Sequence, residues 1–222
     1  MRHALLLAVA ALMLAGCGGS EKKNSVPINL SLPAKLDLTN YDYIYFPGFI
    51  SDVKNENFLP DEEAVNFFRR ELVREDVMDV VEKEPLDLSD KDPRSFFERE
   101  QPFFQTVEVD NPGRTLALTG VVSFEVRDLS SFRRVQDETV NGRVVYRTQF
   151  VEMTGFELSI RVCVYDLKTG RMLYRELLSD DMDVLGKEAD QRLAYYDLLQ
   201  RVSNRVLGLF TNTVVQDQRI LK

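Results

Sequence analysis

The chain has 222 residues, 28 of them basic and 36 acidic, which gives a net charge of −8 with histidine neutral. This acidic balance argues against nucleic acid and anionic surfaces as partners, because both select clustered positive charge. His3 is the only histidine, and Cys17 and Cys163 are the only cysteines. A mature chain that begins after His3 therefore has no Ser-His-Asp or Cys-His catalytic site and lacks the commonest zinc ligand. We expect no catalytic residue, no metal and no cofactor.

The first sixteen residues predict a cleaved export signal. Arg2 and His3 supply positive charge before an unbroken apolar run over residues 4–14. This run fits the roughly 7–15 apolar residues of a signal peptide and falls short of the about 20 that span a bilayer as a helix. Gly16 and Cys17 then break the run with small residues, so we expect residues 1–16 to be a signal and not a membrane span.

The segment Leu14-Ala15-Gly16-Cys17 resembles the bacterial lipobox. This resemblance implies that the signal is cut before Cys17, that the Cys17 thiol is diacylated, and that the new amine also carries an acyl chain such as palmitate. Two or more acyl chains hold a protein firmly in a bilayer. Gly18 replaces the aspartate that favours inner-membrane retention in enteric lipoproteins, so we expect the outer membrane, facing the periplasm. The alternative is an ordinary secretory signal that happens to be followed by a cysteine.

The first part of the mature chain is expected to be a flexible tether, followed by one folded domain. Residues 17–40 are polar and small at first and are then interrupted by prolines, a composition typical of a flexible linker. Residues 41–222 are predicted to form a single domain, because about 180 residues are enough to enclose one core. With Cys17 lipidated, Cys163 has no partner for an internal disulfide.

The domain is predicted to open with a strand, a helix and a second strand. The strand over residues 41–49 alternates, with Ile44 and Phe46 toward a core. An acidic first turn and helical spacing of apolar residues predict a helix over 60–75. A strand over 77–82 would complete a βαβ-like unit.

The remaining elements are expected in a defined order. They are a loop over 87–92, a short helix that follows Asp92-Pro93 and carries Phe96 and Phe97 until Pro102, a strand over 115–127, a hairpin that turns at Asn141-Gly142, a strand over 156–167, a last strand over 171–178, a helix over 188–210, and a polar tail or short edge strand over 214–222.

These elements predict an α+β fold, in which a mixed, largely antiparallel sheet has two main helices packed on one face. The other sheet face would be semi-polar and would carry Tyr41, Tyr43, Tyr45, Arg161 and Tyr165. Sheets with one wet face are ordinary, but tyrosine and arginine are enriched at interfaces. We therefore take these five residues as the candidate partner-binding face, with a plain solvated face as the alternative.

A second resemblance covers most of the mature chain. The order of elements, together with Asp166, Thr169 and Gly170 in a D-x-x-T-G turn, is similar to a group of envelope lipoproteins. This group contains the curli-secretion lipoprotein, the penicillin-binding-protein activator lipoproteins and the amino-terminal domain of the TolB type. The resemblance implies no functional residues. A pore is not expected, because residues 132–153 are rich in charged side chains, unlike the apolar-alternating hairpins of the secretion lipoprotein.

Several charged clusters could carry chemistry. Glu98 with Glu100, or Asp87 with Asp90, could act as the acid/base pair of a hydrolase acting on cell-wall glycan. The cluster of Asp180, Asp181 and Asp183 offers oxygen ligands of the kind that Ca²⁺ takes, but a solvated loop before the last helix is the preferred interpretation.

Cys163 and the arginines beside Phe132 are two further candidate sites, and each also has an interpretation without a function. Cys163 lies near Arg161 on one strand face, yet a packed, inert cysteine is favoured over a reactive thiol. Arg133 and Arg134 beside Phe132 could touch lipid headgroups or peptidoglycan, but two arginines are far fewer than the 4–8 of a polybasic membrane patch. We expect a solvated loop tip there.

The leading hypothesis is a lipid-anchored, non-enzymatic envelope protein that binds another envelope protein or cell-wall component as a subunit, adaptor or regulator. The alternatives are the carboxylate-dependent glycan hydrolase and capture of a small apolar ligand between sheet and helix. The identity of the partner and the oligomeric state are left open by the sequence.

Overall fold

The computed structural model describes residues 25–88, 90–98, 101–140, 143–186 and 189–220, and the predicted lipobox, Leu14 to Cys17, lies outside them. Residues 33–213 form one compact unit. Its strands and helices are β2 (Tyr43–Ser51), α2 (Pro60–Arg74), β3 (Asp79–Val80), β4 (Thr115–Asp128), β5 (Ser131–Val140), β6 (Arg143–Val151), β7 (Met153–Asp166), β8 (Met172–Leu185) and α3 (Gln191–Leu207).

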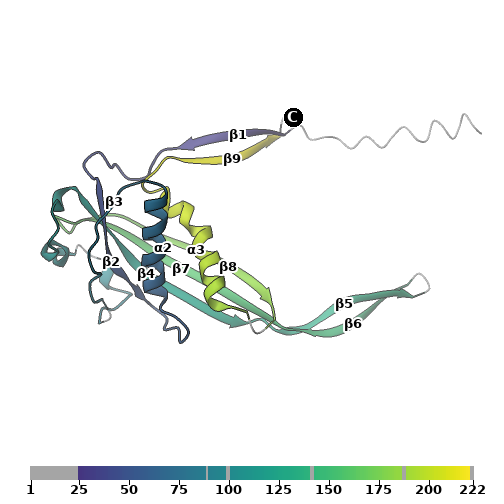
Figure 1. Ribbon diagram of the computed structural model, residues 1–222. Helices are drawn as coiled ribbons and strands as arrows, with labels where there is room; N and C mark the ends of the chain where they lie inside the picture. The colour runs from purple at the N-terminus through teal and green to yellow at the C-terminus, as the bar shows by residue number, and fades with distance from the viewer. Residues whose placement is uncertain (1–24, 89, 99–100, 141–142, 187–188, 221–222) are drawn as a thin grey trace, which may run out of the picture. The chain divides into compact units, whose positions relative to one another are not determined.

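The centre of this unit is a five-stranded sheet in the order β3-β2-β4-β7-β8 (Figure 1). Strand β2 runs parallel to both β3 and β4, whereas β4 with β7 and β7 with β8 are antiparallel. The β2-α2-β3 crossover is the predicted βαβ-like unit, which requires a helix to connect two parallel strands. The predicted α+β class and mixed sheet are confirmed.

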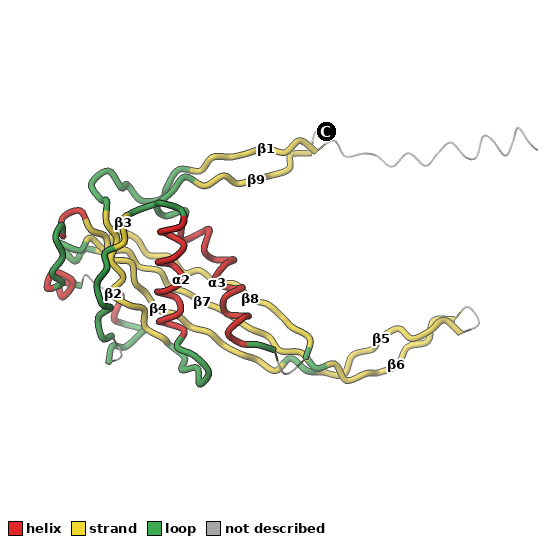
Figure 2. Tube along the Cα trace, viewed as in Figure 1, coloured by secondary structure: helices red, strands yellow, loops and turns green. Residues whose placement is uncertain are grey.

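Helices α2 and α3 cover one face of the sheet, as predicted (Figures 1 and 2). Helix α2 begins at Pro60. Three acidic residues in its first turn stabilise the helix, because negative charge interacts favourably with the positive end of the helix dipole. Helix α3 is capped by Asp190, whose Oδ1 accepts hydrogen bonds from the backbone N–H groups of Arg192 (2.9 Å) and Leu193 (3.0 Å).

The first core lies between these helices and the sheet. Apolar residues of β4 and β7 point alternately toward the helices, and each buried Leu or Phe side chain contributes roughly 1.5–3 kcal/mol. The residues of β4 and β7 in this core are Leu116, Leu118, Val122, Phe124, Phe156, Leu158, Ile160, Val162 and Val164. Val126, near the end of β4, is 40% exposed.

A second core lies on the opposite face of the same sheet. The described part of residues 81–114 supplies its cover, and the regular elements there are the short 3₁₀ turns η1 (Phe96–Glu98), η2 (Pro102–Thr106) and η3 (Pro112–Arg114) (Figure 2). Pro102 begins η2, whereas we had expected it only to end the preceding helix. This core contains Tyr45, Ile50, Leu88, Phe97, Phe104, Val107, Ala117, Val121, Cys163, Tyr165 and Leu167.

Two other pairs of strands form sheets of their own. Strands β5 and β6 form an antiparallel hairpin between β4 and β7 in the chain, as predicted; its turn, Asn141-Gly142, lies outside the described residues. Strands β1 (Ser25–Leu32) and β9 (Thr213–Ile220) form a two-stranded sheet in a separate unit. Strand β1 lies within the segment that the sequence predicts to be a tether. The sequence allows a polar tail or a short edge strand over residues 214–222, and strand β9 (Thr213–Ile220) corresponds to the second alternative.

Candidate docking surfaces

The structure does not expose the whole of the predicted partner-binding face. The Tyr45 and Tyr165 side chains are fully buried in the second core. Tyr45 donates a hydrogen bond from its hydroxyl to the Glu84 carbonyl oxygen (2.8 Å), and the Tyr165 ring lies 5.0 Å from that of Phe104. Because residues 81–114 cover this half of the face, neither tyrosine is available to a partner on the surface.

Tyr41 takes part in a structural contact with the predicted D-x-x-T-G turn. Its hydroxyl donates to Asp166 Oδ2 (2.8 Å), and burial together with this bond raises the pKa of Tyr41 to about 12. Asp166 Oδ1 accepts from the Thr169 N–H (2.7 Å) and hydroxyl (2.9 Å), and Gly170 adopts a positive φ of 68°. Burial alone would raise the pKa of Asp166, but these hydrogen bonds outweigh it and hold that pKa below its ordinary value. The turn is therefore a stabilising feature of the fold.

Cys163 is packed and not reactive. Its side chain is fully buried in the second core. Burial raises the pKa of the thiol to about 12, although the nearby charges of Arg175 and Arg161 act in the opposite direction. A thiol with so high a pKa is almost entirely protonated at neutral pH and is a poor nucleophile.

The other half of the same sheet face is open and acidic. Glu125 of β4 lies opposite Glu157 of β7, which in turn lies opposite Asp181 of β8. Carboxylates directly opposite on neighbouring strands repel each other, and Arg127 lies between two of them, 3.0 Å from Glu125 and 2.5 Å from Glu157. We call Glu125, Glu157, Asp181 and Asp183 the acidic face. Arg161, from the predicted partner-binding set, lies on the same side and is half-buried, as is Tyr43 at the start of β2.

The aspartate cluster was predicted to lie in a loop, but it lies within strand β8. Asp180 faces the helices and pairs with Arg201 (3.5 Å), whereas Asp181 and Asp183 face the opposite side. Alternation along the strand thus separates the three carboxylates. Among the residues that the structure describes, no group of three or more His, Cys, Asp or Glu side chains is placed to hold a metal ion.

The second open surface is the β5–β6 hairpin. Its register places Phe132 opposite Phe150, and Gln136 opposite Tyr146, on one side. The rings of Phe132 and Phe150 lie 5.1 Å apart, and the Arg134 guanidinium lies 5.1 Å from the centre of the Tyr146 ring. These side chains are exposed: 74% for Phe132, 44% for Phe150 and 52% for Tyr146. We call Phe132, Arg134, Tyr146 and Phe150 the aromatic face.

The sequence pointed to only part of the aromatic face. Phe132 and the adjacent arginines were noted as a solvated loop tip, whereas the structure places them on strand β5. The signal that was missed is the alternation of Tyr146 and Phe150 on the far side of the Asn141-Gly142 turn. If the two strands pair across that turn, this alternation places the rings of Phe132, Tyr146 and Phe150 on one side of the hairpin.

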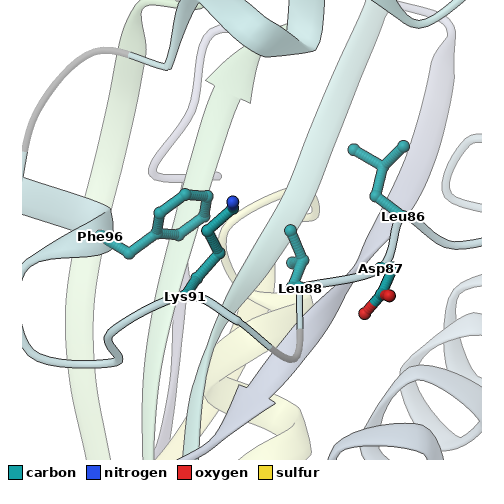
Figure 3. Close-up of a pocket in the computed structure, with 5 residues that line it drawn as sticks. All are labelled: Leu86, Asp87, Leu88, Lys91 and Phe96. Carbon is teal, nitrogen blue, oxygen red and sulfur yellow. The ribbon is translucent and has the colours of Figure 1, made fainter.

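A hollow of about 530 Å³ is bordered by Leu86, Asp87, Leu88, Lys91 and Phe96 (Figure 3). Leu86, Leu88 and Phe96 belong to or pack against the second core. The hollow therefore lies on the sheet face opposite the helices, and not between sheet and helix, where capture of a small apolar ligand was one of the alternatives.

The carboxylates considered for glycan cleavage lie on the covering segment. Asp87 borders the hollow, Asp90 pairs with Lys91 (2.9 Å), and Glu98 is an exposed residue at the end of η1. Glu100 lies outside the described residues. Asp90 and Glu98 are not among the residues that border this hollow.

Comparisons with known proteins leave the family open. No family model and no curated protein matches the chain. It is similar to the solved structure of the hypothetical protein CT253 from Chlamydia trachomatis, with 15% identity over 77% of this chain and 98% of that one and a TM-score of 0.44. It is also similar to lipoprotein GNA1162 from Neisseria meningitidis (10% identity, 75% and 98% covered, TM-score 0.36) and to a minor lipoprotein from Acinetobacter baumannii (10%, 80% and 98%, 0.33).

Helices long and apolar enough to cross a membrane are not found among the described residues.

Proposed function

We propose that this chain is a lipid-anchored, non-enzymatic protein of the cell envelope that binds another envelope component as a subunit, adaptor or regulator. Cys17 is the attachment point of the lipid, and the β5–β6 hairpin is the docking element. The proposal includes an outer-membrane location facing the periplasm.

The exposed aromatic face of the hairpin carries the proposal. Strands β5 and β6 pair only with each other in the described part of the chain, so no third strand covers them. A two-stranded hairpin on its own is at best marginally stable in water, and contiguous exposed apolar patches mark interaction sites. Phe132, Tyr146, Phe150 and Arg134 are also of the residue types enriched at protein interfaces. Burial of these rings by a partner would stabilise the hairpin and the complex together.

Isolation of the protein from crosslinked envelopes tests this proposal. The double variant Phe132→Ser with Phe150→Ser should lose the crosslinked partner that the wild-type chain retains. Its fold should be intact, with a free energy of unfolding within about 0.5 kcal/mol of wild type, because both rings are exposed. Leu193→Ser is the matched control, since Leu193 is 60% exposed and belongs to helix α3, not to the hairpin. A double variant that retains the partner at the wild-type level contradicts the proposal.

A further inference from the structure

The hairpin and the acidic face are two unlike surfaces of one chain that complement each other. We propose that the hairpin of one copy docks on the acidic face of a second copy. This inference rests on the proposed function, because it names the envelope component as the protein itself.

The hairpin is a cationic region of an acidic chain. Residues 131–151 contain four arginines and two acidic residues, whereas acidic residues outnumber basic ones over the whole sequence. Register puts Arg133 and Arg147 on one side of the hairpin and Arg134 on the aromatic side. Positive charge is thus presented from both sides, beside exposed aromatic rings.

The acidic face offers the opposite charge and apolar surface of its own. Its four carboxylates outnumber the three arginines on that side, Arg127, Arg161 and Arg175, so the face carries one net negative charge. Among the strands that the structure describes, β8 pairs with β7 alone, so it is an edge of the five-stranded sheet. Leu177 and Leu185, which lie on the same side of β8 as Asp181 and Asp183, are 59% and 76% exposed. Exposed leucines on a long edge strand invite contact with another chain.

The charged and the apolar residues of the two surfaces contribute differently to association. Exposed charges steer an encounter and fix its orientation more than they add affinity. Burial of aromatic side chains against leucine supplies the affinity. A hairpin of about twenty residues is also close to the roughly 20–30 residues that each partner contributes to a stable interface. Because the two surfaces differ, the contact is heterologous and can repeat from copy to copy.

Charge reversal tests the pairing by sedimentation velocity of the purified mature protein. Arg133→Glu with Arg134→Glu should weaken self-association about tenfold, and so should Asp181→Lys with Asp183→Lys, because each places like charges across the contact. The chain that carries all four substitutions should regain association. Arg70→Glu with Lys168→Glu makes the same change in charge at exposed positions elsewhere and should leave association unchanged.

Three results overturn the inference. One is a wild-type protein that remains monomeric, and another is a fourfold variant that associates no better than the double variants. The third is a hairpin variant that loses binding to phosphatidylglycerol vesicles while self-association persists. If the crosslinking experiment still recovers a different partner through the hairpin, this inference fails while the proposed function stands. If that experiment also recovers nothing, both fail.

Discussion

A small set of polar contacts ties the ends of the compact unit to its sheet. Lys35 Nζ lies 2.8 Å from Glu176 Oε2, and Arg205 of α3 lies 3.1 Å from the other oxygen of the same carboxylate. Tyr174 donates a third bond to Glu176 (2.7 Å). Burial alone would raise the pKa of Glu176, but these three partners outweigh it and lower that pKa from 4.5 to about 2. The contacts connect the chain before β2 with β8 and α3.

The acid stability of the protein should depend on Glu176. Because its folded pKa is depressed, the carboxylate stabilises the fold above about pH 4.5, and this stabilisation is lost as the pH falls toward 2. We expect Glu176→Gln to cost about 1–2 kcal/mol at pH 7, since Lys35 and Arg205 are nearly half exposed and solvent screens the pairs. Urea unfolding of both proteins from pH 7 to pH 2 measures this difference. The curves should converge at low pH, and a constant separation across that range contradicts the assignment.

At the scale of elements, the sequence predicts those with regular periodicity. Strands β4 and β7 and both helices were recognised because apolar residues recur in them at the expected spacing. Strand β8 was predicted to end at Leu178, because three aspartates interrupt its alternation, yet it continues to Leu185. The strand continues because its backbone pairs with β7, and the side-chain pattern of the sequence does not reveal this pairing.

The covering segment escaped prediction for a related reason. Residues 81–114 have no regular period, so their apolar residues could not be assigned to a face from the sequence. In the structure Phe97 and Phe104 are fully buried over Tyr165 and Cys163. The predicted semi-polar sheet face was therefore correct only for the open, acidic half.

The cover should be testable through the thiol beneath it. Phe104→Ala removes a buried ring and should destabilise the fold by about 3 kcal/mol, and it should also speed alkylation of Cys163 by opening the cover locally. Phe68→Ala, in the first core, is the matched control, because it removes a ring of the same size on the other side of the sheet. Alkylation of the mature, lipidated protein is followed by mass spectrometry. Equal labelling rates in variants of equal stability contradict a locally opening cover.

At the scale of the whole molecule, the sequence predicted the α+β class and the side on which the helices pack, but not the pairing of β1 with β9. These two strands are separated by 180 residues of chain, and no short-range pattern connects them. The aromatic face also depends on strand pairing, because its side chains come together only when β5 and β6 are in register. Features that depend on long-range pairing were thus the ones that the sequence left open.

The proposed anchor makes a prediction for the whole protein. Cys17→Ser should move the protein from the membrane fraction to the soluble fraction, because it removes the thiol that would carry the acyl chains. Centrifugation of lysed cells with immunodetection measures the distribution. Ser20→Ala serves as a control near the same site and should remain with the membrane. Membrane fractionation that survives the loss of the Cys17 thiol contradicts lipid anchoring.

The hairpin is the surface at which we propose that this protein binds its partner in the envelope. Site-specific photo-crosslinking in living cells tests it directly, with a photoreactive residue placed at Phe132, at Phe150 or at Leu193 of α3. All three side chains are exposed, so exposure alone does not separate them. We predict a discrete crosslinked product from the two hairpin positions and none from Leu193. Products of equal yield from all three positions, or from Leu193 alone, would contradict the claim.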